Sequence, residues 1–240
     1  MDVSSWDLQG LAIVDFYTGN LDAELIVESD CAGTETIPAS VFFRTLEQLP
    51  DLESYALGLC QGTVLDIGAG AGSHSLILQQ QGFDVTAVDI SPFSVAVMQQ
   101  RGLQKAICSD IWDYQAEPFD TILMLMNGIG LAGDLKGLER FLKDIKRLLK
   151  PDGQLVLDST DLSYLRKEPG ANTKRILKKG ADYGKVRYQM EYRGVKGPYF
   201  HWLFVDEDTL RKYARRAGWI LQVVYEEDSQ YLARLVLGVG

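Results

Sequence analysis

The central part of the chain alternates short apolar runs with longer amphipathic patterns. The apolar runs predict one strand from Val64 and further strands at 84–88, 105–108, 119–126 and 154–158. The amphipathic stretches predict helices at 73–81, 92–101 and 134–150. Strands that alternate with helices in this way indicate a parallel sheet whose strands are joined by crossover helices.

The C-terminal part has a different pattern. Asp206 begins a predicted helix that ends at Gly218, and two predicted strands follow at 219–225 and 231–237. The short acidic turn between these two strands requires an antiparallel pair. The chain is therefore predicted to hold five strands with crossovers, one further helix and a terminal strand hairpin, which makes the fold class α/β.

A glycine-rich run follows the first predicted strand. Residues 64–72 read Val-Leu-Asp-Ile-Gly-Ala-Gly-Ala-Gly, and their alternating glycines allow a tight turn, positive φ and a close approach of a ligand to the backbone. A dinucleotide fingerprint, G-x-G-x-x-G, would need a third glycine at position 73, where this chain has Ser73. A purely structural turn needs one glycine rather than three. The run thus favours a nucleotide-type pocket that differs from the standard dinucleotide site.

The spacing Asp66-x-Gly68-x-Gly70-x-Gly72 resembles motif I of the class I S-adenosylmethionine-dependent methyltransferases. The order of strands, with its terminal hairpin, also resembles the sheet of that family. The resemblance implies a three-layer α/β/α sandwich with a seven-stranded, mostly parallel sheet and an antiparallel last strand. It divides the chain into an N-terminal lid or accessory segment at 1–61 and a methyltransferase-like domain at 62–240, with a substrate-cover insertion at about 160–204 that contains a β-hairpin.

The same resemblance implies S-adenosylmethionine as the cofactor. Asp66 is suited to orient the cationic amino end of its methionine tail. Asp89 ends the second strand 21 positions after Gly68, near the spacing at which a carboxylate meets ribose hydroxyls, and Ile90 offers an apolar wall to adenine. The loop residues expected against the cofactor are Gly68, Ala69, Gly70 and Gly72.

Two further strand ends complete the expected site. The segment 108–112 is similar to the family motif in which an acid accepts the adenine amino group and the next N–H contacts the ring, which assigns these roles to Asp110 and Ile111. Asn127 follows the fourth strand, where the methyl group is expected to be transferred. Family members that methylate amides or exocyclic amines carry Asn or Asp, Pro, Pro and an aromatic residue there, and this chain keeps only the Asn, which argues against such substrates. Asn127 either positions the substrate or the cofactor amino group, or forms a type I′ turn with Gly128.

Arg44 is the only Lys or Arg among the first hundred residues. It lies in a predicted short helix at 38–46 that would fold over the cofactor as a lid. There its guanidinium would pair bidentately with the methionine carboxylate. A salt bridge within the acidic N-terminal segment explains the residue equally well, so both interpretations stay open.

Methyl transfer demands little chemistry from the protein, because the sulfonium already activates the methyl carbon. Proximity and orientation are expected to dominate, and a general base is optional. His201, in the inserted hairpin, and Asn127 are the candidate catalytic residues, while His74, Asp158 and Asp161 are further groups that could accept a proton. The acceptor is expected to be a small molecule, which the sequence does not identify.

Composition limits the partners and the location. The chain has 240 residues and a net charge of −9, which fits one α/β domain with an accessory segment and disfavours nucleic-acid binding. Residues 1–60 hold eleven carboxylates and one arginine, whereas residues 160–196 hold ten basic and four acidic side chains. Solvated faces explain this distribution, and the two segments could also attract each other across a pocket or a subunit interface, such as that of a homodimer.

No stretch approaches the roughly 20 apolar residues of a membrane helix, and no leader is recognisable, so a cytoplasmic protein without a membrane partner is expected. The three cysteines are scattered, are expected to be buried, and have no histidine cluster nearby. They indicate neither a disulfide framework nor a metal site.

Two other functions fit parts of the pattern. An NAD(P)-dependent oxidoreductase would use the same Asp89, but Ser73, the terminal hairpin and the lack of a Tyr-x-x-x-Lys pair disfavour it. A non-catalytic S-adenosylmethionine-binding or scaffold protein would keep the pocket without turnover. Methyl transfer from S-adenosylmethionine is the leading interpretation.

Overall fold

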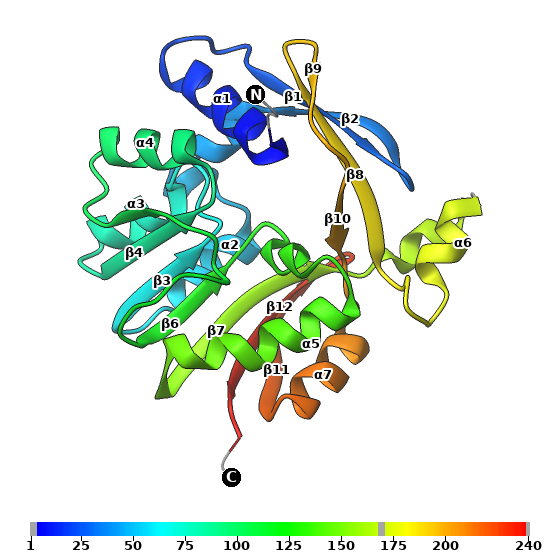
Figure 1. The fold of residues 1–240 in the computed structure, drawn as a ribbon. Coiled ribbons are helices and arrows are strands. Elements are labelled where there is room, and N and C mark those ends of the chain that lie inside the picture. Colours follow the sequence, from blue (N-terminus) through cyan, green and yellow to red (C-terminus); the bar gives the residue numbers. More distant parts are fainter. Residues whose placement is uncertain (1–3, 168–170, 239–240) are drawn as a thin grey trace. The chain divides into compact units, whose positions relative to one another are not determined.

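The computed structural model describes residues 4–167 and 171–238 (Figure 1). Its α-helices are α1 Ser5–Tyr17, α2 Asp51–Gly58, α3 Ser73–Gln80, α4 Pro92–Gln100, α5 Leu135–Asp144, α6 Ala171–Leu177 and α7 Glu207–Arg216. Its 3₁₀-helices are η1 Ala39–Phe43, η2 Leu46–Gln48, η3 Gly128–Ala132, η4 Ile145–Leu148 and η5 Leu162–Lys167. Its strands are β1 Glu24–Ser29, β2 Gly33–Pro38, β3 Thr63–Ile67, β4 Asp84–Asp89, β5 Ala106–Cys108, β6 Phe119–Met124, β7 Leu149–Thr160, β8 Lys185–Tyr192, β9 Val195–Lys196, β10 Phe200–Leu203, β11 Trp219–Glu227 and β12 Gln230–Leu237.

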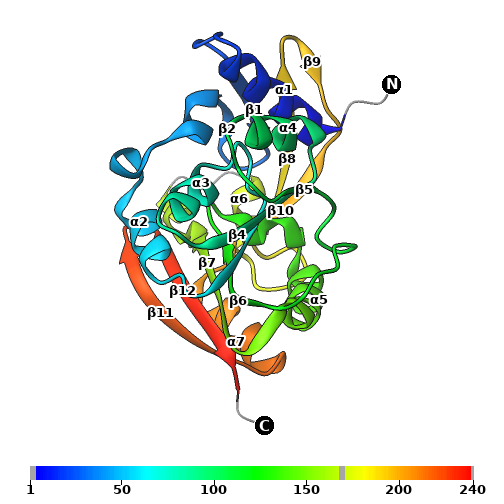
Figure 2. The same ribbon diagram turned by 90° about the vertical axis from the view of Figure 1, so that its left-hand side faces the viewer.

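Seven strands form the main sheet, in the order β11-β12-β7-β6-β3-β4-β5. β4 pairs in parallel with β3 and with β5, and β7 pairs in parallel with β6. β12 is antiparallel to both β7 and β11, and Figure 2 shows β11 and β12 side by side toward the red end of the colour scale. The predicted α/β class, with a seven-stranded sheet and an antiparallel last strand, is confirmed.

The boundary between α5 and β7 differs from the prediction. The helix predicted at 134–150 is α5 followed by η4, and β7 begins at Leu149 instead of residue 154. Leu149 pairs with Phe119, the ladder is then interrupted, and regular pairing resumes with Gln154 on Thr121. Pro151 and Gly153 lie in this irregular part of the strand. Proline has no N–H to donate to a regular ladder, which accounts for the interruption.

The chain divides into two compact units. The first contains Met1–Leu49, Thr63–Tyr114 and Tyr188–Phe200, and the second contains Pro50–Gly62, Gln115–Arg187 and His201–Gly240. Each unit thus combines segments that are distant in the sequence.

In the first unit, β1 and β2 form an antiparallel hairpin, and β8 adds to β1 with Ile26 opposite Glu191. The whole second sheet has the order β10-β8-β1-β2, with β9 on β8. β1 buries Leu25 and Val27 on one face, where they pack with Leu8 and Ala12 of α1. The hydrophobic pattern predicts no strand in this region, yet β1 and β2 are present, so the N-terminal part holds more structure than a lid helix.

The short helix predicted at 38–46 is interrupted. η1 ends at Phe43, Arg44 has an extended conformation with ψ 142°, and η2 begins after Thr45. Thr45 and Gln48 form a capping box, which starts a new turn instead of extending the old one. Arg44 therefore lies between two 3₁₀-helices rather than within one helix.

In the second unit, the predicted helix cap is confirmed, since the Asp206 carboxylate accepts a hydrogen bond from the Thr209 N–H at 2.9 Å. The inserted hairpin is present as β8, which belongs to the first unit from Tyr188 onward, and β10, which belongs to the second unit from His201 onward. The tight turn after β8 adds the short strand β9. No helix among the described residues is long and apolar enough to cross a membrane.

The expectation that all three cysteines are buried is wrong. Cys60 is buried, Cys31 is half-buried and Cys108 is exposed at the end of β5. None of the three, all of which lie within the described residues, forms a disulfide. Across residues 4–167 and 171–238, no group of three or more His, Cys, Asp or Glu side chains is arranged to hold a metal ion.

Candidate functional site

The glycine-rich run forms the turn between β3 and α3 in the first unit. Gly68, Gly70 and Gly72 all have positive φ, at +73°, +57° and +78°. A Cβ at Gly72 would lie 2.8 Å from Met98 Cγ, whereas a Cβ at Gly68 would meet nothing within 4 Å. Packing against Met98 thus explains why residue 72 is a glycine. Beside Gly68, in contrast, the space is open.

Asp66 lies beneath this turn and is almost fully buried, with 2% of its surface exposed. Its carboxylate accepts a hydrogen bond from the Ser75 hydroxyl at 2.6 Å. Burial raises the pKa of Asp66, and His74 and Ser75 partly oppose that shift. The side chain is therefore held near the end of β3, in a dry environment that disfavours its charged form.

Asp89 connects the ends of two adjacent strands. One carboxylate oxygen accepts from the Gly70 N–H at 2.8 Å, and the other accepts from the Ser91 N–H at 2.8 Å. Burial raises the pKa of Asp89 to about 6, although both hydrogen bonds act in the opposite direction. Ile90 follows with an exposed apolar side chain, 46% accessible. An exposed isoleucine beside a buried carboxylate makes a surface suited to the base and sugar of a nucleoside.

Asp110 and Ile111 lie just after β5, the next strand in the sheet. The Ser109 N–H donates to the Asp89 carbonyl at 3.0 Å, so this turn is joined directly to the end of β4. The Asp110 carboxylate accepts from the Trp112 N–H at 3.0 Å, and Ile111 is buried. The structure therefore brings Asp66, Asp89 and Asp110 to the carboxyl edge of three neighbouring parallel strands, where ligands of open α/β sheets bind.

η1 lies on the glycine-rich turn. The Ser73 hydroxyl donates to the Phe42 carbonyl at 2.6 Å, and Phe42 Cδ1 lies 3.4 Å from the position of a Cβ on Gly70. Arg44 follows two residues later and is half-buried. The region that carries Arg44 is thus adjacent to the turn within the same unit.

Asn127 lies in the second unit, in a strained turn after β6. Met126 and Asn127 both have positive φ, at +59° and +57°, whereas Gly128 does not, so the type I′ turn considered for Asn127-Gly128 is wrong. The Asn127 N–H donates to Asp158 at 2.9 Å, and its side-chain oxygen accepts from the Thr160 hydroxyl at 2.9 Å. Asp158 and Thr160 at the end of β7 therefore fix this turn.

The inserted strand β10 contacts the same turn through Trp202. Its indole N–H donates to the Asn127 carbonyl at 3.0 Å, and its ring fills the space beside Gly130. His201, the neighbouring residue, is exposed. Trp202 is recognisable in the sequence as one of several aromatic residues of the insertion, but its contact with the Asn127 turn is not, because nothing local to β10 indicates a partner 75 residues away.

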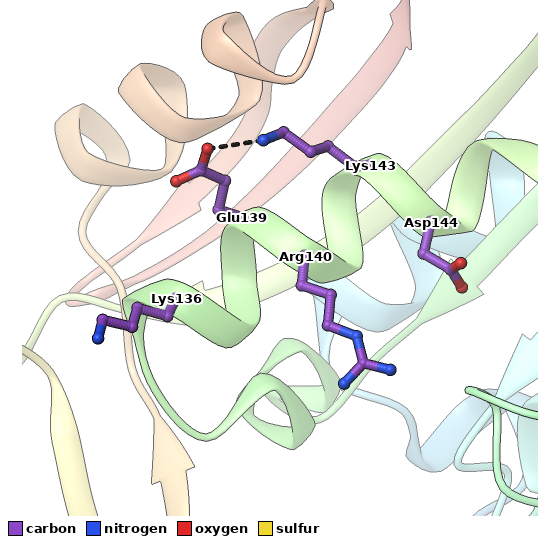
Figure 3. A pocket seen from close by; sticks show the side chains of 5 residues that line it. All are labelled: Lys136, Glu139, Arg140, Lys143 and Asp144. Carbon is purple, nitrogen blue, oxygen red and sulfur yellow. Dashed lines mark hydrogen bonds and ion pairs between the residues drawn. The ribbon is translucent and has the colours of Figure 1, made fainter.

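One surface hollow lies on α5, with a volume of about 600 Å³ (Figure 3). It is lined by Lys136, Glu139, Arg140, Lys143 and Asp144. Glu139 and Lys143 pair at 2.8 Å across one helical turn, and the hydrogen bond from Lys143 lowers the pKa of Glu139. No residue predicted for the site lines this hollow, and its charged side chains are typical of a solvated helix face.

Comparison with known proteins agrees with this geometry. A family model described as a methyltransferase domain matches residues 41–223. A crystal structure of a SAM-dependent methyltransferase from Bacteroides fragilis, in complex with S-adenosyl-L-homocysteine, is 39% identical and covers 98% of this chain and 97% of that chain, with a TM-score of 0.87. The chain belongs to the class I S-adenosylmethionine-dependent methyltransferases.

This methyltransferase also matches curated relatives over shorter stretches. A cypemycin N-terminal methyltransferase from Streptomyces sp is 34% identical over 112 residues, which cover 45% of this chain and 46% of the relative. A ubiquinone biosynthesis O-methyltransferase from Xanthomonas oryzae is 30% identical over 141 residues, which cover 55% of this chain and 54% of the relative. The chain thus spans about half the length of the curated relatives it matches.

Proposed function

We propose that this methyltransferase binds S-adenosylmethionine in its first unit and transfers the methyl group to a small-molecule acceptor. The observation that carries the proposal is the open cradle beside Gly68, where a Cβ would meet nothing within 4 Å, next to the carboxylates of Asp66 and Asp89. The Bacteroides fragilis enzyme, similar over almost the whole chain, is described in complex with S-adenosyl-L-homocysteine, the product that remains after methyl transfer.

The adenosine end is assigned to the ends of β4 and β5. Asp89 would accept hydrogen bonds from the ribose hydroxyls with the lone pairs that Gly70 and Ser91 leave. Ile90 would cover one face of adenine, the Asp110 carboxylate would accept from the adenine amino group, and the Ile111 N–H would donate to the ring. These roles form one continuous surface within a single unit.

The methionine end is assigned to the glycine-rich turn and to η1. The backbone of Gly68, Ala69, Gly70 and Gly72 would lie against the cofactor. Asp66 would attract its ammonium group from beneath the turn, and Arg44 would pair with its carboxylate. Asn127 would contact either the cofactor amino group or the acceptor.

Bound S-adenosylmethionine supplies a methyl carbon already activated by the sulfonium. The protein then contributes mainly orientation, for which the fixed backbone of the Asn127 turn is suited. His201, exposed on β10, is the proposed proton acceptor where the acceptor must lose a proton. If substitution of His201 by alanine leaves turnover of an identified acceptor unchanged, this role is removed.

Calorimetry tests the cofactor assignment. We expect S-adenosylmethionine and S-adenosylhomocysteine to bind and NAD to fail. Arg44→Ala should weaken both ligands by about tenfold or more but leave methylthioadenosine, which lacks the amino-acid tail, nearly unchanged. Binding of NAD alone would refute the proposal, and equal losses for all ligands would remove Arg44 from the site.

The acceptor needs a separate screen. Relatives named ubiquinone biosynthesis O-methyltransferase and demethylmenaquinone methyltransferase direct the first panel toward small phenolic and quinol compounds. Formation of S-adenosylhomocysteine with any member would establish turnover, whereas tight cofactor binding without turnover across broad panels would favour the non-catalytic alternative.

The remaining partner assignments also stay proposals. We propose a cytoplasmic location, no nucleic-acid partner and a homodimer in which the acidic N-terminal segment and the basic insertion attract each other. Light scattering at low and high salt tests the dimer, since an assembly based on this attraction should weaken as salt screens it.

A further inference from the structure

Arg101 is the next Lys or Arg after Arg44 in the sequence. It is the C-cap residue of α4 in the first unit. Its guanidinium donates to the Ala71 carbonyl at 2.5 Å and to the Ser73 hydroxyl at 3.4 Å. The same group lies over the Phe43 ring, 4.8 Å from the centroid. Three contacts therefore join α4 to the glycine-rich turn and to η1.

The environment of Arg101 is unusual for a cation. Burial lowers its pKa, and its partners in the described chain are a carbonyl, a hydroxyl and an aromatic ring rather than a carboxylate. A half-buried guanidinium without a carboxylate needs dipoles and a ring face to replace its lost hydration. The contact with the Phe43 ring face depends on the positive charge, whereas the two hydrogen bonds depend on the N–H groups.

η1 depends on such contacts because it is short. A single 3₁₀ turn of five residues has little stability of its own. The Ser73 hydroxyl fixes the Phe42 carbonyl, while Arg101 covers Phe43 from one side. The ring of Phe16 also packs against the ring of Phe43, and the two ring centroids are 4.7 Å apart.

The position of η1 determines which side chains lie against the glycine-rich turn. Phe42 lies against Gly70, and Arg44 follows directly after the ring that Arg101 covers. We propose that Arg101 is a positioning residue that holds η1 on the glycine-rich turn and thereby sets where Phe42 and Arg44 meet the methyl donor. The contact of Phe42 and Arg44 with the methyl donor rests on the proposed function.

The first test needs no ligand. Limited chymotrypsin digestion, followed by mass spectrometry, measures cleavage after Phe42 and Phe43. Arg101→Met should raise the rate at these bonds by about tenfold, because η1 opens more often without its contact. Lys105→Met is the matched control, since it removes a cation that pairs with Asp84 on the surface of the same unit. Equal rates in wild type and Arg101→Met would overturn the proposal.

Phe43→Leu is a second variant in case Arg101→Met does not fold. It removes the ring and keeps an apolar side chain, so it should also raise cleavage after position 42. Arg101→Lys keeps the charge but replaces the planar guanidinium with a single ammonium nitrogen, so it should give an intermediate rate. A rate for Arg101→Lys equal to that of Arg101→Met would show that the charge does not contribute, which contradicts the contact with the Phe43 ring.

The second test separates positioning from general stability. Arg101→Met should weaken S-adenosylhomocysteine by about tenfold and methylthioadenosine much less. If Arg101 acts through η1, adding Arg44→Ala to this variant should cause little further loss, whereas additive losses would overturn the positioning role. If the wild type binds no cofactor, the proposed function is wrong, and the digestion result alone then decides whether Arg101 holds η1.

Discussion

Gly68→Ala separates the conformational demand of the turn from its contact with a ligand. The added Cβ would meet no atom within 4 Å, so the variant introduces no clash. Residue 68 has φ +73°, and an L-residue with a Cβ loses about 1–2 kcal/mol in the left-handed region. Alanine also lowers the conformational entropy of the unfolded chain relative to glycine, which offsets about 0.4–1 kcal/mol of this loss. We therefore expect a net destabilisation of about 1 kcal/mol.

For a chain of 240 residues, 1 kcal/mol corresponds to a fall in Tm of about 2–4 °C. Gly82→Ala is the matched control, because Gly82 has φ +93° and also nothing within 4 Å of its Cβ position. Scanning fluorimetry should show a similar small fall for both variants.

Binding should distinguish the two variants. A methyl group in the cradle would overlap the cofactor, so Gly68→Ala should weaken S-adenosylhomocysteine by about a hundredfold, or about 3 kcal/mol, while Gly82→Ala keeps the wild-type affinity. Calorimetry measures both. An affinity of Gly68→Ala within threefold of wild type would refute the placement of the cofactor, and a much larger fall in its Tm would refute the open space beside Gly68.

The carboxylate of Asp89, the space beside Gly130 and the thiol of Cys108 each allow a further test. Because the pKa of Asp89 is raised to about 6 and ribose hydroxyls favour the charged carboxylate, S-adenosylhomocysteine affinity should fall as pH drops from 7 to 5, and Asp89→Asn should remove this dependence. Gly130→Ala should lower Tm far more than Gly128→Ala, since its Cβ would lie 2.0 Å from Trp202 Nε1 whereas that of Gly128 meets nothing closer than 3.4 Å. Desolvation at the end of β5 and the nearby carboxylate of Asp89 raise the pKa of the Cys108 thiol, so iodoacetamide should label it rapidly only at alkaline pH, and bound S-adenosylhomocysteine should slow the labelling, as peptide mapping would show.

Local signals in the sequence were sufficient for the parts of the fold that are determined locally. The β3 turn combines a strand, three positive-φ glycines and a helix start within ten residues, and the cap formed by Ser91 and Pro92 needs only its own helix. The same holds for the terminal hairpin, whose two strands are separated by two residues. Such elements can be predicted because the residues that stabilise them are neighbours.

The N-terminal strands of the second sheet, β1 and β2, could not be predicted in this way. β1 pairs with β8, which lies more than 150 residues further along the chain, and its own alternation is masked because Ile26 is apolar on the outer face. The hydrophobic pattern shows a strand clearly only where one face is polar. The bulge in β7 was missed for a related reason, since its Pro151 resembles a helix stop when the pairing with β6 is not known.

Ser73 both departs from the dinucleotide fingerprint and makes two hydrogen bonds that stabilise the turn. In the sequence it counts against a dinucleotide fingerprint, because a third glycine would be needed there for close packing of helix and strand. In the structure its hydroxyl donates to Phe42 and accepts from Arg101, two contacts that glycine cannot make. The departure from the fingerprint is therefore the feature that joins η1 to the turn. A substitution that restored the fingerprint, Ser73→Gly, should loosen η1 without creating a dinucleotide site.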